Sequence, residues 1–354
     1  MVIRVRPGRR QDLRRRFTWS GPPPLLLLAT VLGVLVAPAV ADDAPRSTAI
    51  PHTASPAAGV TRPARSVEPR LVRQVELDRS RGGQSAGSVA PVKRAIDVVG
   101  IASMNVLQTQ SASAASADVL RLIDRPGLDV VGWQEAQAVG GMLHELPGWT
   151  TATFPEKGGF AELAVSWRTT KFKFVKAEIV DAIDGVDAAT TEFPFGSRQI
   201  AVVTLEHRAS GGRLTVLDAH LPPMIEDPDR PGRWAATVNA QQARTQLRDL
   251  VDAWRAAGTR WVVGTGDFNF DAASDQKHRP SGGPARTVGQ VARSTYQLLG
   301  AAPRPTYPSQ ERSIDYVWVD RHALGAGRID ALGQRVLTGF NSDHRPLAAR
   351  LQLN

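Results

Sequence analysis

The chain of 354 residues contains no cysteine, and this absence excludes several kinds of protein. Without thiols there are no disulfides, no thiolate metal sites and no cysteine nucleophile. The sequence also lacks a glycine-rich phosphate loop ending in Lys-Ser/Thr and a Gly-x-Ser-x-Gly elbow. It therefore gives no indication of an enzyme driven by nucleotide hydrolysis or of a serine hydrolase. A folded part of roughly 260 residues buries enough surface to be stable without disulfides.

The positive charge of the chain lies in its N-terminal quarter. Residues 1–95 hold 16 Lys+Arg and 6 Asp+Glu, a net charge of +10, which leaves residues 96–354 at −1. A surface that binds nucleic acid through its charge must itself be basic. The overall charge of +9 is therefore no sign of such a surface on the folded part, although a local basic groove is compatible with it.

Residues 1–41 have the composition of a secretory signal peptide. A basic stretch from Arg4 to Arg16 precedes an apolar run from Leu25 to Val36, and the small residues 39–41 form a cleavage site. Residues 14–17 partly fit a twin-arginine signal, so the general and the twin-arginine export routes both remain open. An uncleaved anchor is the alternative, but an apolar segment of about 17 residues is short for spanning a bilayer. We expect a cleaved leader, no stable membrane span afterwards, and a secreted protein.

Residues 42–95 are expected to be a disordered linker. They are rich in Pro, Ala, Ser, Gly and Arg, and contain no Phe, Tyr or Trp. The linker is either a solvated spacer or an electrostatic tether to an anionic cell surface. The remaining residues, 96–354, are expected to form one folded domain.

Apolar runs and their spacing predict an α+β domain. Strands are expected at 97–107, 128–133, 163–167, 172–180, 200–205, 214–217, 261–263, 314–319 and 347–353, and helices at 116–123, 235–257 and 288–299. Strand clusters interleaved with helices indicate two packed sheets flanked by helices.

Six short polar motifs stand in one order along residues 104–344. They are Met104-Asn105, Trp133-Gln134-Glu135, Asp218-Ala219-His220-Leu221, Gly266-Asp267-Phe268-Asn269, Ser313-Ile314-Asp315-Tyr316 and Ser342-Asp343-His344. Each places a carboxylate, amide or imidazole at the end of a buried strand. Hydrolysis of a phosphodiester needs oxygen ligands for a hard cation, a group that orients or deprotonates water, and an acid for the leaving oxygen.

Each motif alone has an ordinary structural interpretation. Asp-Phe-Asn is more often a loop whose side chains bond its own backbone, and Asn105 could simply form a turn. Glu135 could be an exposed strand-end acid, but a buried one would need a cation or another partner. His220 and His344 differ from the other histidines because both directly follow strand patterns and lie near acids. Asp315 is the acid expected to hold one of these imidazoles in its tautomer.

The motifs, in this order, resemble the endonuclease/exonuclease/phosphatase superfamily over residues 96–352. That superfamily includes exonuclease III, pancreatic-type DNases, neutral sphingomyelinases and inositol polyphosphate 5-phosphatases. Residues 164–168, followed by Phe172, also look like a strand segment of that superfamily. The resemblance implies a four-layer α/β/β/α sandwich of two packed, mostly antiparallel sheets flanked by helices, with the site at one edge of both sheets.

The resemblance also implies roles for individual residues. Asn105 and Glu135 would bind Mg²⁺ or Mn²⁺, with Asp343 contributing to that ion or to a second one. His220 would contact phosphate or act as general acid. Asp267 and Asn269 would position water and phosphate, and Asp315 with His344 would form the couple that binds or deprotonates the nucleophile. Arg198 falls where members often have a residue that contacts phosphate.

The sequence departs from some branches of the superfamily. Repair endonucleases use a tyrosine in the middle of the chain, whereas the three tyrosines here lie at 296, 307 and 316. The Trp-Cys-Asp-Arg signature of the 5-phosphatases is absent at Ser313–Tyr316, and Asp218-Ala219 replaces the usual Asn-Thr before His220.

We therefore expect a secreted, divalent-metal-dependent phosphodiesterase, foremost a nuclease acting as a monomer on extracellular nucleic acid. The alternatives are a phospholipase C of the sphingomyelinase kind and a binding protein that retains a dead site. Phe193 and Phe195 could touch a membrane in the phospholipase, or could simply pack.

Overall fold

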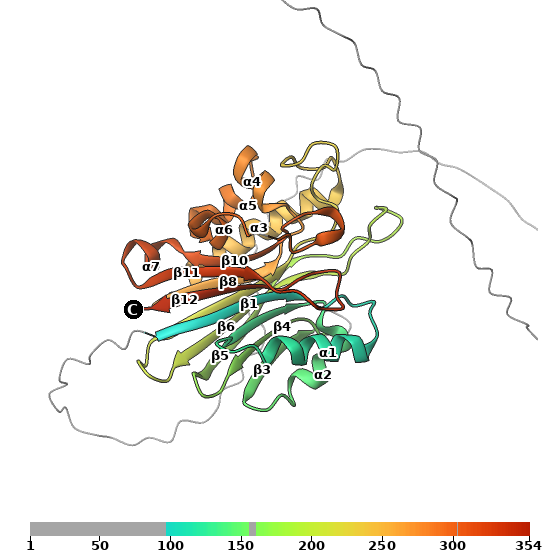
Figure 1. Cartoon of the computed structure of the whole chain (residues 1–354). Helices are drawn as coiled ribbons and strands as arrows, with labels where there is room; N and C mark the ends of the chain where they lie inside the picture. Colours follow the sequence, from blue (N-terminus) through green and yellow to red (C-terminus); the bar gives the residue numbers. More distant parts are fainter. Residues whose placement is uncertain (1–96, 156–160, 303) are drawn as a thin grey trace, which may run out of the picture. The chain divides into compact units, whose positions relative to one another are not determined.

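The computed structural model describes residues 97–155, 161–302 and 304–354, so the expected signal peptide (1–41) and linker (42–95) lie outside the described residues. Two six-stranded sheets form the centre of the domain (Figure 1). In spatial order, the first sheet contains β11 (Ile329–Val336), β12 (Leu347–Leu353), β1 (Asp97–Asn105), β2 (Val130–Gln134), β4 (Ala161–Arg168) and β3 (Trp149–Pro155). The second contains β5 (Phe172–Ile183), β6 (Arg198–His207), β7 (Arg213–His220), β8 (Trp261–Asp267), β10 (Asp315–Asp320) and β9 (Ala292–Ser294).

The sheets are mixed but mostly antiparallel, as expected. Only the β1–β2 and β7–β8 pairings among the named strands are parallel. The expected hairpin is present, since β6 and β7 pair in antiparallel fashion with Leu205 opposite Leu214.

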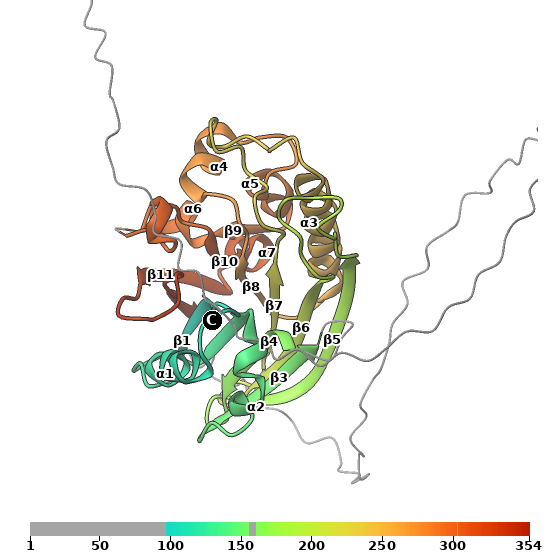
Figure 2. The same ribbon diagram turned by 90° about the vertical axis from the view of Figure 1, so that its right-hand side faces the viewer.

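Helices cover the outer face of each sheet. The first sheet carries α1 (Ala112–Ile123), η1 (Ala136–Ala138) and α2 (Gly140–Leu143). The second sheet lies beside α3 (Val238–Ala256), α4 (Ala272–His278), α5 (Pro284–Thr287), η2 (Val288–Gln290), α6 (Thr295–Leu299), η3 (Pro308–Gln310) and α7 (Arg321–Gly325). Figures 1 and 2 show α1 and α2 on one side of the paired sheets and α3, α4 and α5 on the other. The α+β sandwich of four layers is confirmed. Within the described ranges, no helix combines the length and apolar character that crossing a bilayer needs.

Alternation along β1 explains how one strand serves both layers. Val99 and Ile101 belong to the large core cluster that includes both sheets and α3. Ala102 and Met104 point the opposite way and pack in the second cluster, with α1. Successive strand side chains face opposite sides of a sheet. Asn105 therefore continues the row of Val99 and Ile101 and faces the other sheet.

The expectation of one helix over 288–299 is wrong. These residues form η2, the short strand β9 and the short helix α6. Ser294 caps α6 in a capping box with Gln297, and this pair of residues is a start signal that the apolar spacing concealed. The strands β3 and β11 were also missed, since neither contains a sustained apolar run.

Asp275 in α4 gives a testable dependence of stability on pH. Burial raises the pKa of this carboxyl from 3.8 to about 7, while its Oδ2 accepts a hydrogen bond from the Ala285 amide. The folded state thus binds the Asp275 proton more tightly than the unfolded chain does. The contribution of the protonated carboxyl to the free energy of unfolding is therefore fully present below pH 3.8 and is lost as the pH rises through 7.

Asp275→Asn keeps an acceptor for Ala285 and removes the ionisation. Urea unfolding should show the variant gaining up to about 4 kcal/mol over the wild type between pH 4 and pH 8. The matched control is Asp252→Asn, at an exposed acid of α3. An equal pH dependence in wild type and Asp275→Asn would contradict the assignment.

Candidate active site

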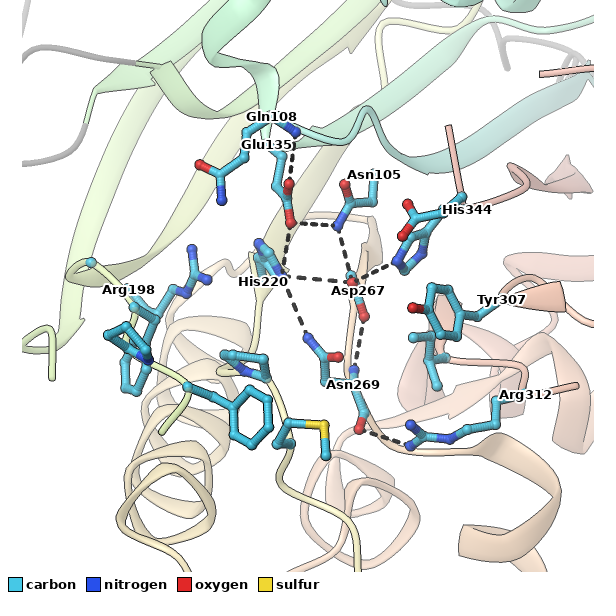
Figure 3. A pocket seen from close by; sticks show the side chains of 18 of the residues that line it. Asn105, Gln108, Glu135, Arg198, His220, Asp267, Asn269, Tyr307, Arg312 and His344 are labelled. Carbon is cyan, nitrogen blue, oxygen red and sulfur yellow. Dashed lines mark hydrogen bonds and ion pairs between the residues drawn. The ribbon is translucent and has the colours of Figure 1, made fainter. Parts of the chain in front are cut away.

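The strand register brings the polar motifs to one edge of the two sheets. In the second sheet, Asp267 lies opposite His220 on β7 and opposite Asp315 on β10. In the first sheet, Asn105 and Gln134 end β1 and β2 side by side. Of these residues, Asn105, His220 and Asp267 line a pocket of about 380 Å³. Figure 3 shows Asp267 with Asn105, His220, His344 and Asn269 around it.

An amide from one sheet lies between two acids. The Asn105 Nδ2 donates to Glu135 Oε1 and to Asp267 Oδ2, each at 3.1 Å, while its Oδ1 accepts from the Leu107 amide. The Gln108 amide donates to the other Glu135 oxygen at 2.8 Å. Asn105 thus ties the first sheet to the second and holds two carboxylates near each other.

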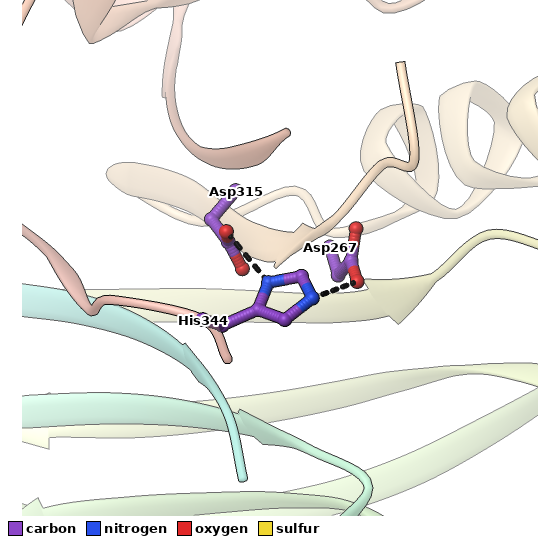
Figure 4. Close-up of side chains that lie close together, drawn as sticks. All are labelled: Asp267, Asp315 and His344. Atoms are coloured by element: carbon purple, nitrogen blue, oxygen red, sulfur yellow. Dashed lines mark hydrogen bonds and ion pairs between the residues drawn. The ribbon is translucent and has the colours of Figure 1, made fainter. Parts of the chain in front are cut away.

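His344 is held by a buried acid. Its Nδ1 lies 2.9 Å from Asp315 Oδ2, and its Nε2 lies 3.6 Å from Asp267 Oδ2 (Figure 4). The Tyr307 ring packs against the imidazole with centroids 5.0 Å apart. Burial lowers the pKa of His344, but the carboxylates of Asp315 and Asp267 outweigh burial and raise the pKa to about 10. The expected Asp315–His344 couple is therefore present, with the ring charged at neutral pH.

A second couple is formed by His220 and Glu162, a residue that the sequence reasoning missed. His220 Nδ1 lies 2.5 Å from Glu162 Oε1, and His220 Nε2 lies 3.6 Å from Asp267 Oδ2. Arg198 pairs with the same Glu162 oxygen. Burial raises the pKa of Glu162, but Arg198 and His220 more than reverse this and bring it below its usual range.

Glu162 could have been found only from its place in the strand. It lies in β4, directly before the apolar residues 163–165, and is 3% exposed. A buried acid on an otherwise apolar strand needs a partner, and that partner was not readable from spacing. Arg198, expected to contact phosphate, lines the pocket and is also bound to Glu162.

The remaining expected residues also line the pocket. The backbone N–H of Asn269 donates to Asp267 Oδ1 at 2.8 Å. The side-chain Nδ2 of Asn269 donates to Leu221 O at 3.1 Å and lies 3.5 Å from His220 Nε2. Asp343 is half-buried, and burial together with Glu135 and Asp267 raises its pKa. Glu135 and Asn269 both have positive φ, at 54° and 48°. A left-handed backbone at a residue other than glycine is strained and commonly marks a functional site.

A second arginine of the pocket was missed. Arg312 donates to Glu226 Oε2 at 2.5 Å and to Asn269 O at 3.1 Å. Glu226 in turn accepts from the backbone amides of Gly232 and Asp271. Arg312 is thus fixed next to Asn269 by three separate segments of chain, which no local sequence pattern indicates.

A polar cluster between the sheets holds the two halves of the site in register. Asp218 Oδ1 accepts from Gln134 Nε2 and from Thr265 Oγ1, each at 2.7 Å. Gly132 makes room for the cluster, because a Cβ there would lie 2.0 Å from Thr265 Oγ1. Burial raises the pKa of Asp218 well above its usual range. This acid, which stands where the resemblance implies asparagine, thus accepts hydrogen bonds from both sheets.

The donor set fits a hard divalent cation. Glu135, Asp267 and Asp343 bring three carboxylates together beside the Asn105 amide, and oxygen donors of this kind suit Mg²⁺ or Mn²⁺. The Oδ1 atom of Asp343 is buried and has no hydrogen-bond partner within the described ranges. Asp267, Asp315 and His344 also form a group whose potential ligand atoms lie within 4.8 Å of one another. There, however, the Asp315 Oδ2 and the His344 Nδ1 are bonded to each other.

Solved structures resemble the fold. A protein from Bacteroides thetaiotaomicron described as an endonuclease/exonuclease/phosphatase family protein has a TM-score of 0.54 and 16% identity, covering 73% of this chain and 96% of its own. D. rerio TDP2 complexed with single-strand DNA product has a TM-score of 0.53 and 16% identity, covering 72% and 98%. The human Nocturnin catalytic domain with bound sulfate has a TM-score of 0.51 and 17% identity, covering 73% and 98%. At these identities the likeness shows the fold and not the substrate.

The sequence itself matches no curated protein significantly. It does match the family model described as "Endonuclease/Exonuclease/phosphatase family" over residues 102–344. This match runs from β1 to His344 and covers well over half of the chain. The chain therefore belongs to the Endonuclease/Exonuclease/phosphatase family.

Proposed function

We propose that the protein is a divalent-metal-dependent phosphodiesterase that cleaves extracellular nucleic acid. The family is one of phosphoric ester hydrolases. One observation carries the proposal. Two imidazoles, each bonded to a buried acid, lie with their Nε2 atoms 3.6 Å from the same carboxylate oxygen, Asp267 Oδ2. A phosphate with its attacking and leaving oxygens needs polar groups converging on one point in this way.

Asn105, Glu135 and Asp343 would hold Mg²⁺ or Mn²⁺. When bound, such an ion polarises the phosphoryl oxygens and offsets their negative charge. The pKa of His344 of about 10 makes its ring an imidazolium at neutral pH, the form that binds an anionic phosphate. Asp267 accepts hydrogen bonds from the Asn105 side chain and from the backbone N–H of Asn269, and this positions it to orient the attacking water.

His220 is the proposed proton donor to the leaving oxygen. Its Nδ1 is bound to Glu162, which leaves Nε2 facing the pocket near Asn269. The proposed phosphate contacts are the side-chain amide of Asn269 and the guanidinium groups of Arg198 and Arg312. All three residues line the pocket. Amide and guanidinium donors suit phosphate oxygens.

Nucleic acid is the proposed substrate for two reasons. Arg198 and Arg312 lie on opposite sides of the pocket (Figure 3). Positive groups on both sides can bind successive phosphates of one nucleic-acid strand. Among the similar structures, that of D. rerio TDP2 was solved with a single-strand DNA product. The expected leader at 1–41 supports secretion, and we propose that the secreted protein acts as a monomer.

A second candidate is a phospholipase C of the sphingomyelinase kind. Phe193 and Met224, 39% and 36% exposed, both line the pocket. Asn239 ties their two loops together, because its Nδ2 donates to Phe193 O and to Pro223 O at 2.9 Å each. A fixed apolar lip beside a phosphodiester site could contact acyl chains. Phe195, by contrast, is 9% exposed and packs against Ile183 and Val186.

The test is hydrolysis by the purified protein of single-stranded DNA, RNA and sphingomyelin vesicles, each with Mg²⁺ or with excess chelator. We expect cleavage of nucleic acid only with the metal, and none by Asp267→Asn. Cleavage that survives chelation would contradict the mechanism. Turnover of sphingomyelin without cleavage of nucleic acid would establish the second candidate instead.

A further inference from the structure

A second hollow, lined by arginines, lies outside the catalytic pocket among the helices of the second sheet. It has a volume of about 340 Å³ and lies between α4, η2, β9 and α7. Arg279, Arg293 and Arg321 line it, together with the amides of Gln276 and Gln297. Figure 1 shows α4, α5 and α6 grouped on the outer side of the second sheet. None of these residues belongs to the proposed catalytic machinery.

No carboxylate forms an ion pair with the arginines of this hollow within the described ranges, although the buried Asp275 interacts electrostatically with Arg279. The hydrogen bonds of the Arg293 and Arg321 side chains go to backbone carbonyls. Arg321 Nη1 donates to Gly289 O at 2.7 Å, and Arg293 Nη2 donates to Gln297 O at 3.1 Å. Arg286 does not line the hollow, but its Nη1 donates to Arg279 O at 3.4 Å.

The sequence around the hollow carries positive charge without negative charge. Residues 276–299 contain Lys277 and three arginines but no Asp or Glu. Asp275 precedes this stretch and is 1% exposed, with one oxygen bound to the Ala285 amide. In a domain whose net charge is −1 over residues 96–354, this is a local basic surface with room for a ligand.

The lining fits an anionic chain better than a membrane or an apolar partner. Six large apolar side chains are exposed within the described ranges, and none of them lines the hollow. Its apolar lining is limited to Ala285 and Ala292. Guanidinium groups bind phosphates in a bidentate manner, and flanking amides can donate to phosphate or sugar oxygens.

The hollow is close to the catalytic pocket along the chain. Asn269 lines the pocket, Asp271 caps α4, and Arg279 ends α4 with a positive φ of 46°. A helix of seven residues is about 10 Å long, a length matched by roughly three nucleotides at 3.4 Å each. One nucleic-acid strand could therefore occupy both places.

We propose that Arg279, Arg293 and Arg321 form a second binding site for the phosphate backbone of a nucleic-acid strand whose scissile bond lies in the catalytic pocket. The inference rests on the proposed nuclease function. The site raises affinity for long strands and makes no contact with the reacting phosphate. Small phosphodiesters therefore gain nothing from it.

The test compares the wild type with the triple variant Arg279→Gln/Arg293→Gln/Arg321→Gln. Binding of a fluorescent single-stranded DNA of about 30 nucleotides is measured in chelator, where no cleavage occurs, over a range of salt concentrations. Losing three phosphate contacts should lower the slope of log affinity against log salt by about 2 and weaken binding roughly tenfold or more at low salt. Hydrolysis of bis(p-nitrophenyl) phosphate with Mg²⁺ should be unchanged.

The matched control is Arg248→Gln/Arg335→Gln/Arg350→Gln, which removes three exposed charges elsewhere on the domain. Equal binding by the triple variant and the wild type, or an equal loss in the control, would overturn the second site. Loss of binding to anionic vesicles, with DNA binding intact, would do the same. A wild type that binds DNA through these arginines but never cleaves it would overturn the nuclease function alone.

Discussion

Replacing His344 by alanine will lower kcat by about 10²- to 10⁴-fold, the usual contribution of a positioned acid–base group. The imidazole is the only group within the described ranges that is bonded to Asp315 through Nδ1 and faces Asp267 through Nε2. Its removal deletes a positive charge beside Asp267, at the edge of the pocket. Initial rates on DNA and on bis(p-nitrophenyl) phosphate should fall together, since the loss concerns the reacting phosphate and not the length of the strand.

Stability must be followed in the same experiment. Without His344, the buried carboxyl of Asp315 loses the partner of its Oδ2, and burial raises its pKa. Thermal unfolding should therefore be measured for His344→Ala, and rates corrected for the folded fraction. Asp315→Asn is the informative companion. Because the Asp315 carboxylate raises the pKa of His344, this variant should move the pH profile of kcat to lower pH.

The control is His322→Ala, at an exposed histidine of α7. It should leave both rate and pH profile unchanged. A folded His344→Ala protein whose kcat stays within about tenfold of the wild type would remove this imidazole from the chemistry. A profile unmoved by Asp315→Asn would show that the acid does not act through the ring.

The convergence of the site could be predicted because its residues end buried strands. Asn105, His220 and Asp267 are the last residues of β1, β7 and β8, and Asp315 begins the antiparallel strand β10 at the same edge. His344 precedes β12, which runs antiparallel to β1 and begins at that edge too. A polar residue directly after an apolar run is visible in sequence, and parallel or antiparallel pairing then decides the meeting point.

The supporting residues could not be predicted in this way. Glu162 lies within a strand and reaches His220 from the opposite sheet, so only the packing of the sheets reveals their contact. Arg312 depends on Glu226, which is 86 residues away in sequence. The mistaken helix at 288–299 has a related cause, since apolar spacing in a short segment does not separate helix from strand.

Replacing Glu135 by glutamine will remove most of the stabilisation by Mg²⁺ and most of the Mg²⁺-dependent activity. Glu135 is the proposed ligand that meets Asn105, and the left-handed backbone at φ 54° aims it into the pocket. The change to glutamine keeps size and shape and removes one negative charge. With Mg²⁺ at about 100 times its dissociation constant, the wild type should gain about 2.7 kcal/mol of stability, and the variant little of it.

Thermal unfolding with and without Mg²⁺ measures this gain, independently of catalysis. The control is Glu145→Gln, an exposed acid outside the pocket, which should keep the full stabilisation and the full rate. If the glutamine variant is stabilised as strongly as the wild type, Glu135 is not a ligand. If Mg²⁺ and Mn²⁺ stabilise neither protein, the carboxylates of Glu135, Asp267 and Asp343 hold no such ion. Their mutual repulsion would then have to be offset by the hydrogen-bond donors and the charged ring of His344 that surround them.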